Sequence, residues 1–261
     1  LADNYRVALL NSKNAWRILG QESYAFEVAQ WYGWDTYRKC VFVPIGNAGN
    51  VTAIMSGFLK LKKLGVIRSL PRIFGVQSHH ADPVFQYYDE ADPAKREFRA
   101  VPVTPSAAQA AMIGNPVSFP RVAHFAKEYE KIGGPGSFQV VQVTEQAIVE
   151  GMLLANRHGH ISCTQGGECL AGLQKAKELG LIEASEEAIL DATAHHLKFI
   201  GFQEMYFEDS FPAAYGVKAD PKYVNRPRSI MTDADKAALT PEDYTAKAAS
   251  AIVESLGLAR K

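Results

Sequence analysis

Short apolar runs rich in β-branched residues alternate along this chain with longer amphipathic segments of helical period. Runs of the first kind predict buried strands, and segments of the second kind predict helices. The predicted strands cover residues 6–10, 39–45, 72–77, 138–143 and 188–192. The predicted helices of the same region cover residues 21–32, 50–64, 120–131, 145–158 and 168–179. This alternation predicts an α/β fold with a mostly parallel, twisted sheet flanked by helices on both faces.

The alternation weakens after about Phe207, where several prolines and aromatic residues occur with little periodicity. A helical pattern returns in two closing segments, residues 233–238 and 241–256. We therefore predict a large α/β domain over residues 1–209 and a C-terminal extension over residues 210–261.

A glycine-containing turn follows the second predicted strand, within the segment VFVPIGNAGNVTA. A strand, a glycine turn and a helix start in series direct several backbone N–H groups at one point, together with the positive end of the helix dipole. We expect an anion there, most simply a phosphate. The spacing matches neither the P-loop nor the dinucleotide fingerprint, and an ordinary turn between strand and helix is the alternative. The turn, called the glycine loop below, comprises Gly46, Asn47, Ala48, Gly49 and Asn50.

Polar residues follow the first and last predicted strands as well. Asn11, Ser12 and Arg17 come after the first, and Thr193 comes after the last. Ligands of parallel sheets bind beyond the carboxyl ends of the strands, so these residues are expected beside the glycine loop. An arginine there can hold a phosphate or carboxylate with its planar fork, although a solvated arginine is the simpler alternative.

Three further motifs carry weaker signals. His79–His80 and His195–His196 are adjacent pairs, which make poor metal ligands, so we expect ordinary polar packing and no metal. The turn over residues 162–168 contains two glycines that permit either close approach to a ligand or a tight turn. Glu168 in that turn is favourable near a helix N-terminus for dipole reasons alone.

Composition narrows the function classes. A formal net charge of zero over 261 residues gives no electrostatic footprint for nucleic acid, and no apolar run is long enough to cross a bilayer. We therefore expect neither nucleic acid nor membrane as a partner. The three scattered cysteines are typical of reduced thiols, which favours the cytoplasm; they are Cys40, Cys163 and Cys169.

Five segments in order resemble the threonine synthases, within the fold-type-II family of pyridoxal-phosphate (PLP) enzymes. They are NSKNAWRILGQESYAFE, VPIGNAGNVTA, RIFGVQSHHADP, AAMIGNPVSFPR and DATAHHLKF. The resemblance covers nearly the whole chain. It implies the large domain of the tryptophan-synthase-β-like fold, with PLP as the cofactor.

The same resemblance implies a role for each candidate residue. The glycine loop would hold the cofactor phosphate, and Thr193 would face the pyridine nitrogen. Asn11, Ser12 and Arg17 would bind the phosphate of the substrate, O-phosphohomoserine. The implied reaction is the γ-elimination of phosphate followed by addition of water at Cβ, which gives L-threonine and inorganic phosphate.

One expected part of the family pattern has no match. The lysine that carries the cofactor as a Schiff base belongs to a Ser-x-Lys-Asp motif, and no lysine of this chain has that context. We therefore expect no catalytic residue here, a missing N-terminal part of a longer or two-piece enzyme, and no activity of this chain alone. The sequence does not decide whether the chain forms a homodimer. The alternatives are a cysteate synthase, a threonine or serine dehydratase, or a non-catalytic phosphate- or nucleotide-binding module.

Overall fold

A four-stranded sheet organises most of the chain in the computed structural model, which describes residues 4, 6–9, 11, 14–227 and 229–259. The strand order is β3-β2-β1-β4, and every neighbouring pair is parallel. Its strands are β1 (Lys39–Pro44), β2 (Arg72–Ser78), β3 (Phe138–Val143) and β4 (Glu187–Leu190).

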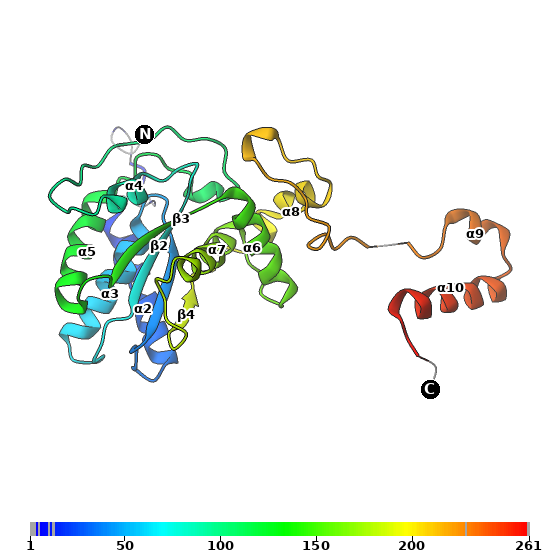
Figure 1. Cartoon of the computed structure of the whole chain (residues 1–261), viewed down its shortest axis with the longest axis horizontal. Helices are drawn as coiled ribbons and strands as arrows, with labels where there is room; N and C mark the ends of the chain where they lie inside the picture. Colours follow the sequence, from blue (N-terminus) through cyan, green and yellow to red (C-terminus); the bar gives the residue numbers. More distant parts are fainter. Residues whose placement is uncertain (1–3, 5, 10, 12–13, 228, 260–261) are drawn as a thin grey trace. The chain divides into compact units, whose positions relative to one another are not determined.

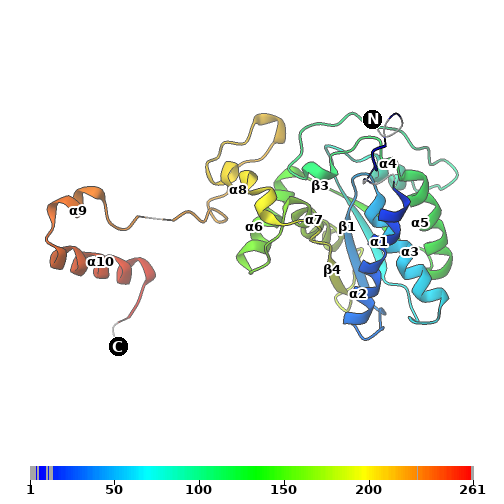
Figure 2. The same cartoon turned by 180° about the vertical axis from the view of Figure 1, so that it is seen from behind.

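Helices cover both faces of this sheet (Figures 1 and 2). On one face lie α3 and α5, with α1 and α2 packed against α3; on the other lies α7, backed by α6 and then α8. The sheet-flanking helices are α1 (Ala15–Gln21), α2 (Ser23–Trp31), α3 (Gly49–Lys63), α4 (Pro83–Asp89), α5 (Phe119–Gly133), α6 (Glu145–Arg157), α7 (Thr164–Glu178) and α8 (Ile200–Phe207). Three short 3-10 turns are η1 (Gln109–Ala111), η2 (His196–Lys198) and η3 (Ala213–Tyr215).

Burial on both faces explains the continuous apolar character of the central strands. All residues of β1 after Lys39 are buried, and so are all residues of β2 after Arg72. Glycines let α7 approach the sheet closely. A Cβ on Gly172 would lie only 2.5 Å from Cγ2 of Val76, so this position has no room for a side chain. The predicted α/β class, with a parallel sheet flanked by helices, is confirmed.

The predicted strand at residues 6–10 is wrong for the part that the structure describes. Residues 6–9 form no strand, Val7 and Leu9 are exposed, and Leu10 lies outside the described residues. The free edge of β1 is occupied by β4, which starts with Glu187 opposite Lys39. An apolar run without a neighbouring strand edge has no hydrogen-bonding partner to hold it extended.

Two predicted helices of the sheet region differ from the structure by more than two residues. The predicted helix at residues 21–32 is the end of α1 followed by α2, with a break at Glu22. The Glu22 carboxylate accepts hydrogen bonds from Ser56 Oγ at 2.7 Å and from the ammonium of Lys60, which anchors the break to α3. The helix predicted to start at Glu168 begins four residues earlier, at Thr164.

A second compact unit, Val224–Lys261, follows the first, which comprises Leu1–Tyr223. It contains α9 (Asp233–Ala238) and α10 (Pro241–Leu256), and both predicted helices are confirmed. The predicted boundary after residue 209 stays a prediction. Within the described part of the chain, no helix is both long and apolar enough to cross a membrane.

Candidate functional site

The sheet has a topological switch point between β1 and β4. From β1 the chain passes through α3 to β2 on one side, whereas β4 pairs with the opposite edge of β1. The connections therefore leave the carboxyl ends of β1 and β4 in different directions, which opens a crevice between them. The glycine loop follows β1, and Asp191 and Thr193 follow β4, so both lie at this crevice.

A pocket of about 280 Å³ occupies the crevice, and it is called the phosphate-loop pocket below. Every predicted site residue lines it except Ser12, which lies outside the described residues. Pro44, Gln21, Gln165, Ala110 and Ala111 complete the lining, and sequence reasoning did not find them. The predicted site residues in the lining are Asn11, Arg17, Gly46, Asn47, Ala48, Gly49, Asn50 and Thr193.

The start of α3 presents unsatisfied donors to this pocket. Ala48 is the N-cap residue, and its methyl group cannot accept a hydrogen bond from the helix. Within the described residues, the N–H groups of Gly49, Asn50 and Val51 donate to no acceptor, and no acidic residue lies in the first turn. Uncapped N–H groups at the positive end of a helix of 15 residues form a binding site for an anion. This donor set fits a phosphate group.

Gly46 serves close packing rather than an unusual dihedral angle. The left-handed position is Ala48, with φ +62°. At Gly46 an added Cβ would lie 2.9 Å from both the Ala110 carbonyl oxygen and the Ala111 Cα, so the loop rests directly on the backbone of η1. The segment that contains η1 therefore forms one wall of the pocket, and Gly46 sets its distance from the loop.

Asp191 joins the two sides of the pocket. Its Oδ2 accepts from Asn50 Nδ2 at 2.5 Å, and its Oδ1 accepts from the Thr193 N–H at 3.2 Å. Burial raises the pKa of the Asp191 carboxyl, and these two hydrogen bonds oppose that shift. The glycine loop and Thr193, which lie far apart in the chain, are thus positioned by one carboxylate.

Gln165 is a buried side chain in the pocket wall. Its carboxamide oxygen accepts from the N–H groups of Gln109 and Ala110, at 3.2 and 3.1 Å. These contacts fix the plane of the Gln165 amide in the pocket wall. The sequence signal for this side chain is the predicted turn at residues 162–168. In the structure that segment contains the start of α7.

The glycines of that turn pack against protein. A Cβ on Gly166 would lie 2.1 Å from Ser162 Oγ, and one on Gly167 would lie 2.3 Å from the Ile148 carbonyl oxygen. Of the two functions left open, ligand approach and tight local packing, the contacts show packing. Cys163 is the N-cap of α7, and its Sγ accepts from the Gly166 N–H at 3.4 Å.

The first loop supplies polar groups from the other side of the pocket. Asn14 caps α1 by accepting from the Trp16 N–H at 2.9 Å, and its N–H donates to the Asn11 carbonyl oxygen at 2.9 Å. This turn carries Asn11 and Arg17 to the pocket. Arg17 is exposed and has no carboxylate partner among the described residues, so its guanidinium is available to an anionic ligand.

Two buried carboxyl groups lie behind the η1 wall. Glu145 accepts from Ser78 Oγ and from the Ala107 N–H, the latter at 2.5 Å. Glu168 is fully buried, and neither of its oxygens has a hydrogen-bond partner in the described part of the chain. Burial, reinforced by the neighbouring Glu145, raises the pKa of Glu168 well above its usual value. Burial thus opposes the charged form that the helix dipole alone would favour.

The histidine pairs make local polar contacts. His80 Nδ1 lies 2.6 Å from the Pro105 carbonyl oxygen, and His196 Nδ1 lies 3.3 Å from Asn156 Nδ2. His79 faces the Val143 carbonyl oxygen, and His195 accepts from the Leu197 N–H. Among the described residues no group of three or more His, Cys, Asp or Glu side chains could hold a metal ion.

Comparison with known proteins identifies the family of this chain. A family model described as "Pyridoxal-phosphate dependent enzyme" matches residues 1–190. The chain is 32% identical over 193 residues to threonine synthase 2, chloroplastic, of Arabidopsis thaliana, covering 74% of this chain and 36% of the relative. It is 34% identical over 201 residues to a threonine synthase of Methanocaldococcus jannaschii, covering 76% and 46%. The chain thus spans less than half the length of these relatives.

Solved structures show the same fold. The threonine synthase of Escherichia coli aligns with a TM-score of 0.57 at 22% identity, over 82% of this chain and 44% of that one. A fungal L-serine ammonia-lyase from Rhizomucor miehei aligns with a TM-score of 0.55 at 13% identity, over 74% and 57%. The predicted resemblance and the PLP cofactor of the family are confirmed, and this chain belongs to the pyridoxal-phosphate dependent enzymes.

Proposed function

We propose that this chain is the phosphate-binding part of a threonine synthase, which converts O-phospho-L-homoserine and water into L-threonine and phosphate. One observation carries the proposal: the phosphate-loop pocket gathers the glycine loop, Thr193, Asn11 and Arg17 at one switch point. The threonine synthases among its relatives support the choice of substrate.

Each side of the pocket has a separate task in this proposal. The N–H groups at the start of α3 hold the cofactor phosphate, and the Asn50–Asp191 hydrogen bond keeps that helix end in place. The Thr193 hydroxyl bonds the pyridine nitrogen, and Asp191 orients its backbone. When bound, the cofactor supplies an electron sink for carbanions.

Asn11, Ser12 and Arg17 bind the substrate phosphate. In the net reaction one Cβ–H bond breaks with loss of its proton, and the Cγ–O bond breaks with its electron pair leaving on phosphate, which takes up the second proton of the water. Water then supplies a hydroxyl to Cβ, and a proton is delivered to Cγ. A phosphate that leaves and a phosphate that stays need two sites, and the exposed guanidinium of Arg17 can release its ligand more readily than the half-buried glycine loop.

The lysine that anchors the cofactor is, in this proposal, contributed by polypeptide outside this sequence. No lysine is among the described residues that line the phosphate-loop pocket, while Lys13 lies outside the described residues. We propose that the chain binds PLP but does not turn over substrate alone, and that it works in the cytoplasm. Three buried free thiols fit such a reducing compartment.

Phosphate release from O-phosphohomoserine tests the proposal. The chain alone and the protein translated from the full reading frame are assayed in parallel with PLP. We expect release by the longer protein only. Turnover of phosphoserine with sulfite instead would identify a cysteate synthase, and ammonia release from threonine or serine would identify a dehydratase. Absence of PLP binding by both proteins would indicate a non-catalytic module.

Borohydride reduction of the PLP-loaded chain tests the origin of the lysine. We expect no reduced cofactor adduct on any lysine of these 261 residues when peptides are mapped by mass spectrometry. A stoichiometric adduct, on Lys13 for example, would overturn the idea that the lysine comes from elsewhere.

A further inference from the structure

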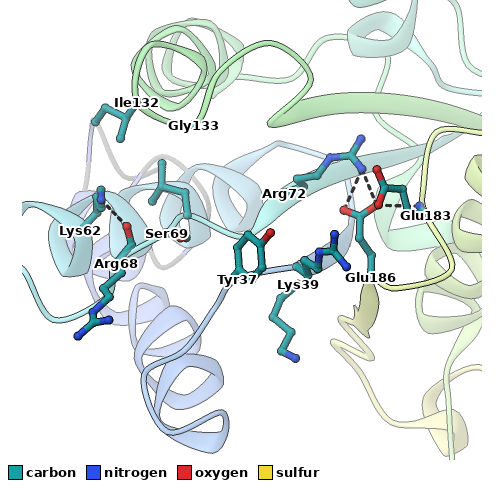
Figure 3. A pocket seen from close by; sticks show the side chains of 12 residues that line it. Tyr37, Lys39, Lys62, Arg68, Ser69, Arg72, Ile132, Gly133, Glu183 and Glu186 are labelled. Atoms are coloured by element: carbon teal, nitrogen blue, oxygen red, sulfur yellow. Dashed lines mark hydrogen bonds and ion pairs between the residues drawn. The ribbon is translucent and has the colours of Figure 1, made fainter.

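A second and larger pocket, of about 560 Å³, lies at the opposite edge of the sheet (Figure 3). Lys39 and Arg72, the first residues of β1 and β2, line it. Because the strands are parallel, this edge faces away from the glycine loop, and the proposed function makes no use of it. We call it the amino-edge pocket. Its volume is within the range of small-molecule sites, about 300–1,000 Å³.

Positive charge is concentrated in this lining. The cationic residues are Arg38, Lys39, Lys62, Arg68 and Arg72, and the acidic ones are Glu183 and Glu186. Five cations against two carboxylates leave an excess of three, of which Glu187 outside the pocket neutralises one by pairing with Lys39 at 2.7 Å. The whole chain has a net charge of zero, so this excess is a local feature. A concave basic surface attracts anions and raises their local concentration.

Arg72 is held in place with donors to spare. Its Nη1 donates to both oxygens of Glu186 at 2.9 Å, and its Nε donates to the Gly136 carbonyl oxygen at 3.2 Å. The Nη2 group donates to no atom in the described part of the chain. Figure 3 shows this guanidinium fixed against Glu186 beside the pocket. A preoriented guanidinium edge loses little side-chain entropy when it binds a phosphate oxygen.

Arg38 and Arg68 have no carboxylate within salt-bridge distance among the described residues. The Arg38 guanidinium lies 5.6 Å from the centre of the exposed Tyr37 ring. Tyr37, Arg68 and Arg72 all belong to the lining of the pocket (Figure 3). Arg72 forms one cationic group of the pocket, and Arg38 with Arg68 forms another. Two such groups match an anion with two charged ends better than a single phosphate.

We propose that the amino-edge pocket binds a small molecule with two phosphate groups, of the pyrophosphate or bisphosphate class. Arg72 holds one phosphate with its unused Nη2 edge, and Arg38 and Arg68 turn toward the other. We assign binding, and no chemical step, to this pocket. Helix α3, whose 15 residues span about 22 Å, separates the pocket from the glycine loop, because Lys62 lines one and Gly49 the other.

Isothermal titration of the full chain with pyrophosphate, inorganic phosphate and citrate tests this assignment. We expect pyrophosphate to bind at least about tenfold tighter than phosphate, which corresponds to about 1.4 kcal/mol. Affinity should fall as salt rises, since the contacts are electrostatic. Equal binding of phosphate would refute the two-group site, and tighter binding of citrate would refute its assignment to phosphate.

Single arginine substitutions test where pyrophosphate binds. Arg38→Gln changes an exposed side chain without a carboxylate partner, so the fold should persist, and pyrophosphate affinity should fall about fivefold or more. Arg72→Gln should lower it further, although it leaves Glu186 unpaired, which is why Arg38→Gln is the primary variant. Arg99→Gln, on an exposed arginine remote from the pocket lining, should leave affinity unchanged. Loss of affinity in Arg17→Gln, with Arg38→Gln unaffected, would move the site to the phosphate-loop pocket and overturn the proposal.

Discussion

Glu168 offers a quantitative test of the buried carboxyl pair. Its carboxyl is fully buried, both oxygens lack hydrogen-bond partners among the described residues, and Glu145 lies close by. Glutamine has nearly the same shape and carries no ionisable proton. Glu168→Gln therefore removes one titration from the folded protein while it keeps the packing of α7 on the sheet.

The sign follows from proton linkage. The folded pKa of Glu168 is raised above its usual value of 4.5, so the unfolded chain loses this proton at a lower pH than the folded protein does. Stability attributable to this group is complete below the unfolded pKa, and it declines as pH rises toward the folded pKa. The slope is at most about 1.36 kcal/mol per pH unit, which gives up to about 2.7 kcal/mol between about pH 5.5 and about pH 7.5.

Urea unfolding at those two pH values measures the effect. The change in unfolding free energy between them is determined for the natural chain and for Glu168→Gln, and the two changes are subtracted, which cancels the titrations that the substitution leaves unaltered. We expect the variant to be relatively more stable at the higher pH. Glu178→Gln, on the exposed end of the same helix, serves as the control and should show no such difference. Equal pH slopes in the natural chain and Glu168→Gln would refute the reasoning.

Three further predictions concern packing and the pocket. Gly172→Ala should destabilise the chain by about 1–3 kcal/mol in urea unfolding, because its Cβ would overlap Val76, whereas Gly201→Ala in α8, with open space around it, should be neutral or stabilising. Gly49→Val should lower PLP occupancy of the full chain, read from cofactor absorbance, because a branched side chain crowds the start of α3; unchanged occupancy would contradict the loop assignment. Thr193→Val in the protein from the full reading frame should reduce phosphate release while most cofactor stays bound, and a matching loss of cofactor would contradict its role at the ring nitrogen.

The local hydrophobic pattern was sufficient to predict the strands that pair within the sheet. The strands β1 and β2 are apolar runs because helices cover both faces, whereas β3 is only partly buried; the predicted positions of all three agree with the structure within one residue. The run at residues 6–10 has a similar composition but no strand beside it. Composition alone cannot distinguish these cases, since the difference lies in which edge of β1 is already paired by β4.

The residues of the candidate site also divide into those that the sequence predicts and those that it does not. The glycine loop and Thr193 were predicted to lie together because the ends of parallel strands meet at one edge, and the structure places them in one pocket. Asp191 and Gln165 were missed as pocket residues. The bond from Asn50 to Asp191 spans 141 residues, and the Gln165 amide is fixed by the distant η1 backbone. Such contacts have no local signature in a single sequence.

The N-terminus of α3 has a consequence for how the chain folds. Ser, Thr, Asp or Asn at its N-cap would close this helix internally, and Ala48 cannot. A bound phosphate therefore completes the secondary structure of the chain as a capping side chain would elsewhere. Occupancy and stability become linked through mass action, and a ligand at a hundred times its dissociation constant adds about 2.7 kcal/mol. Supply of the cofactor would then govern how long the chain survives against unfolding and proteolysis.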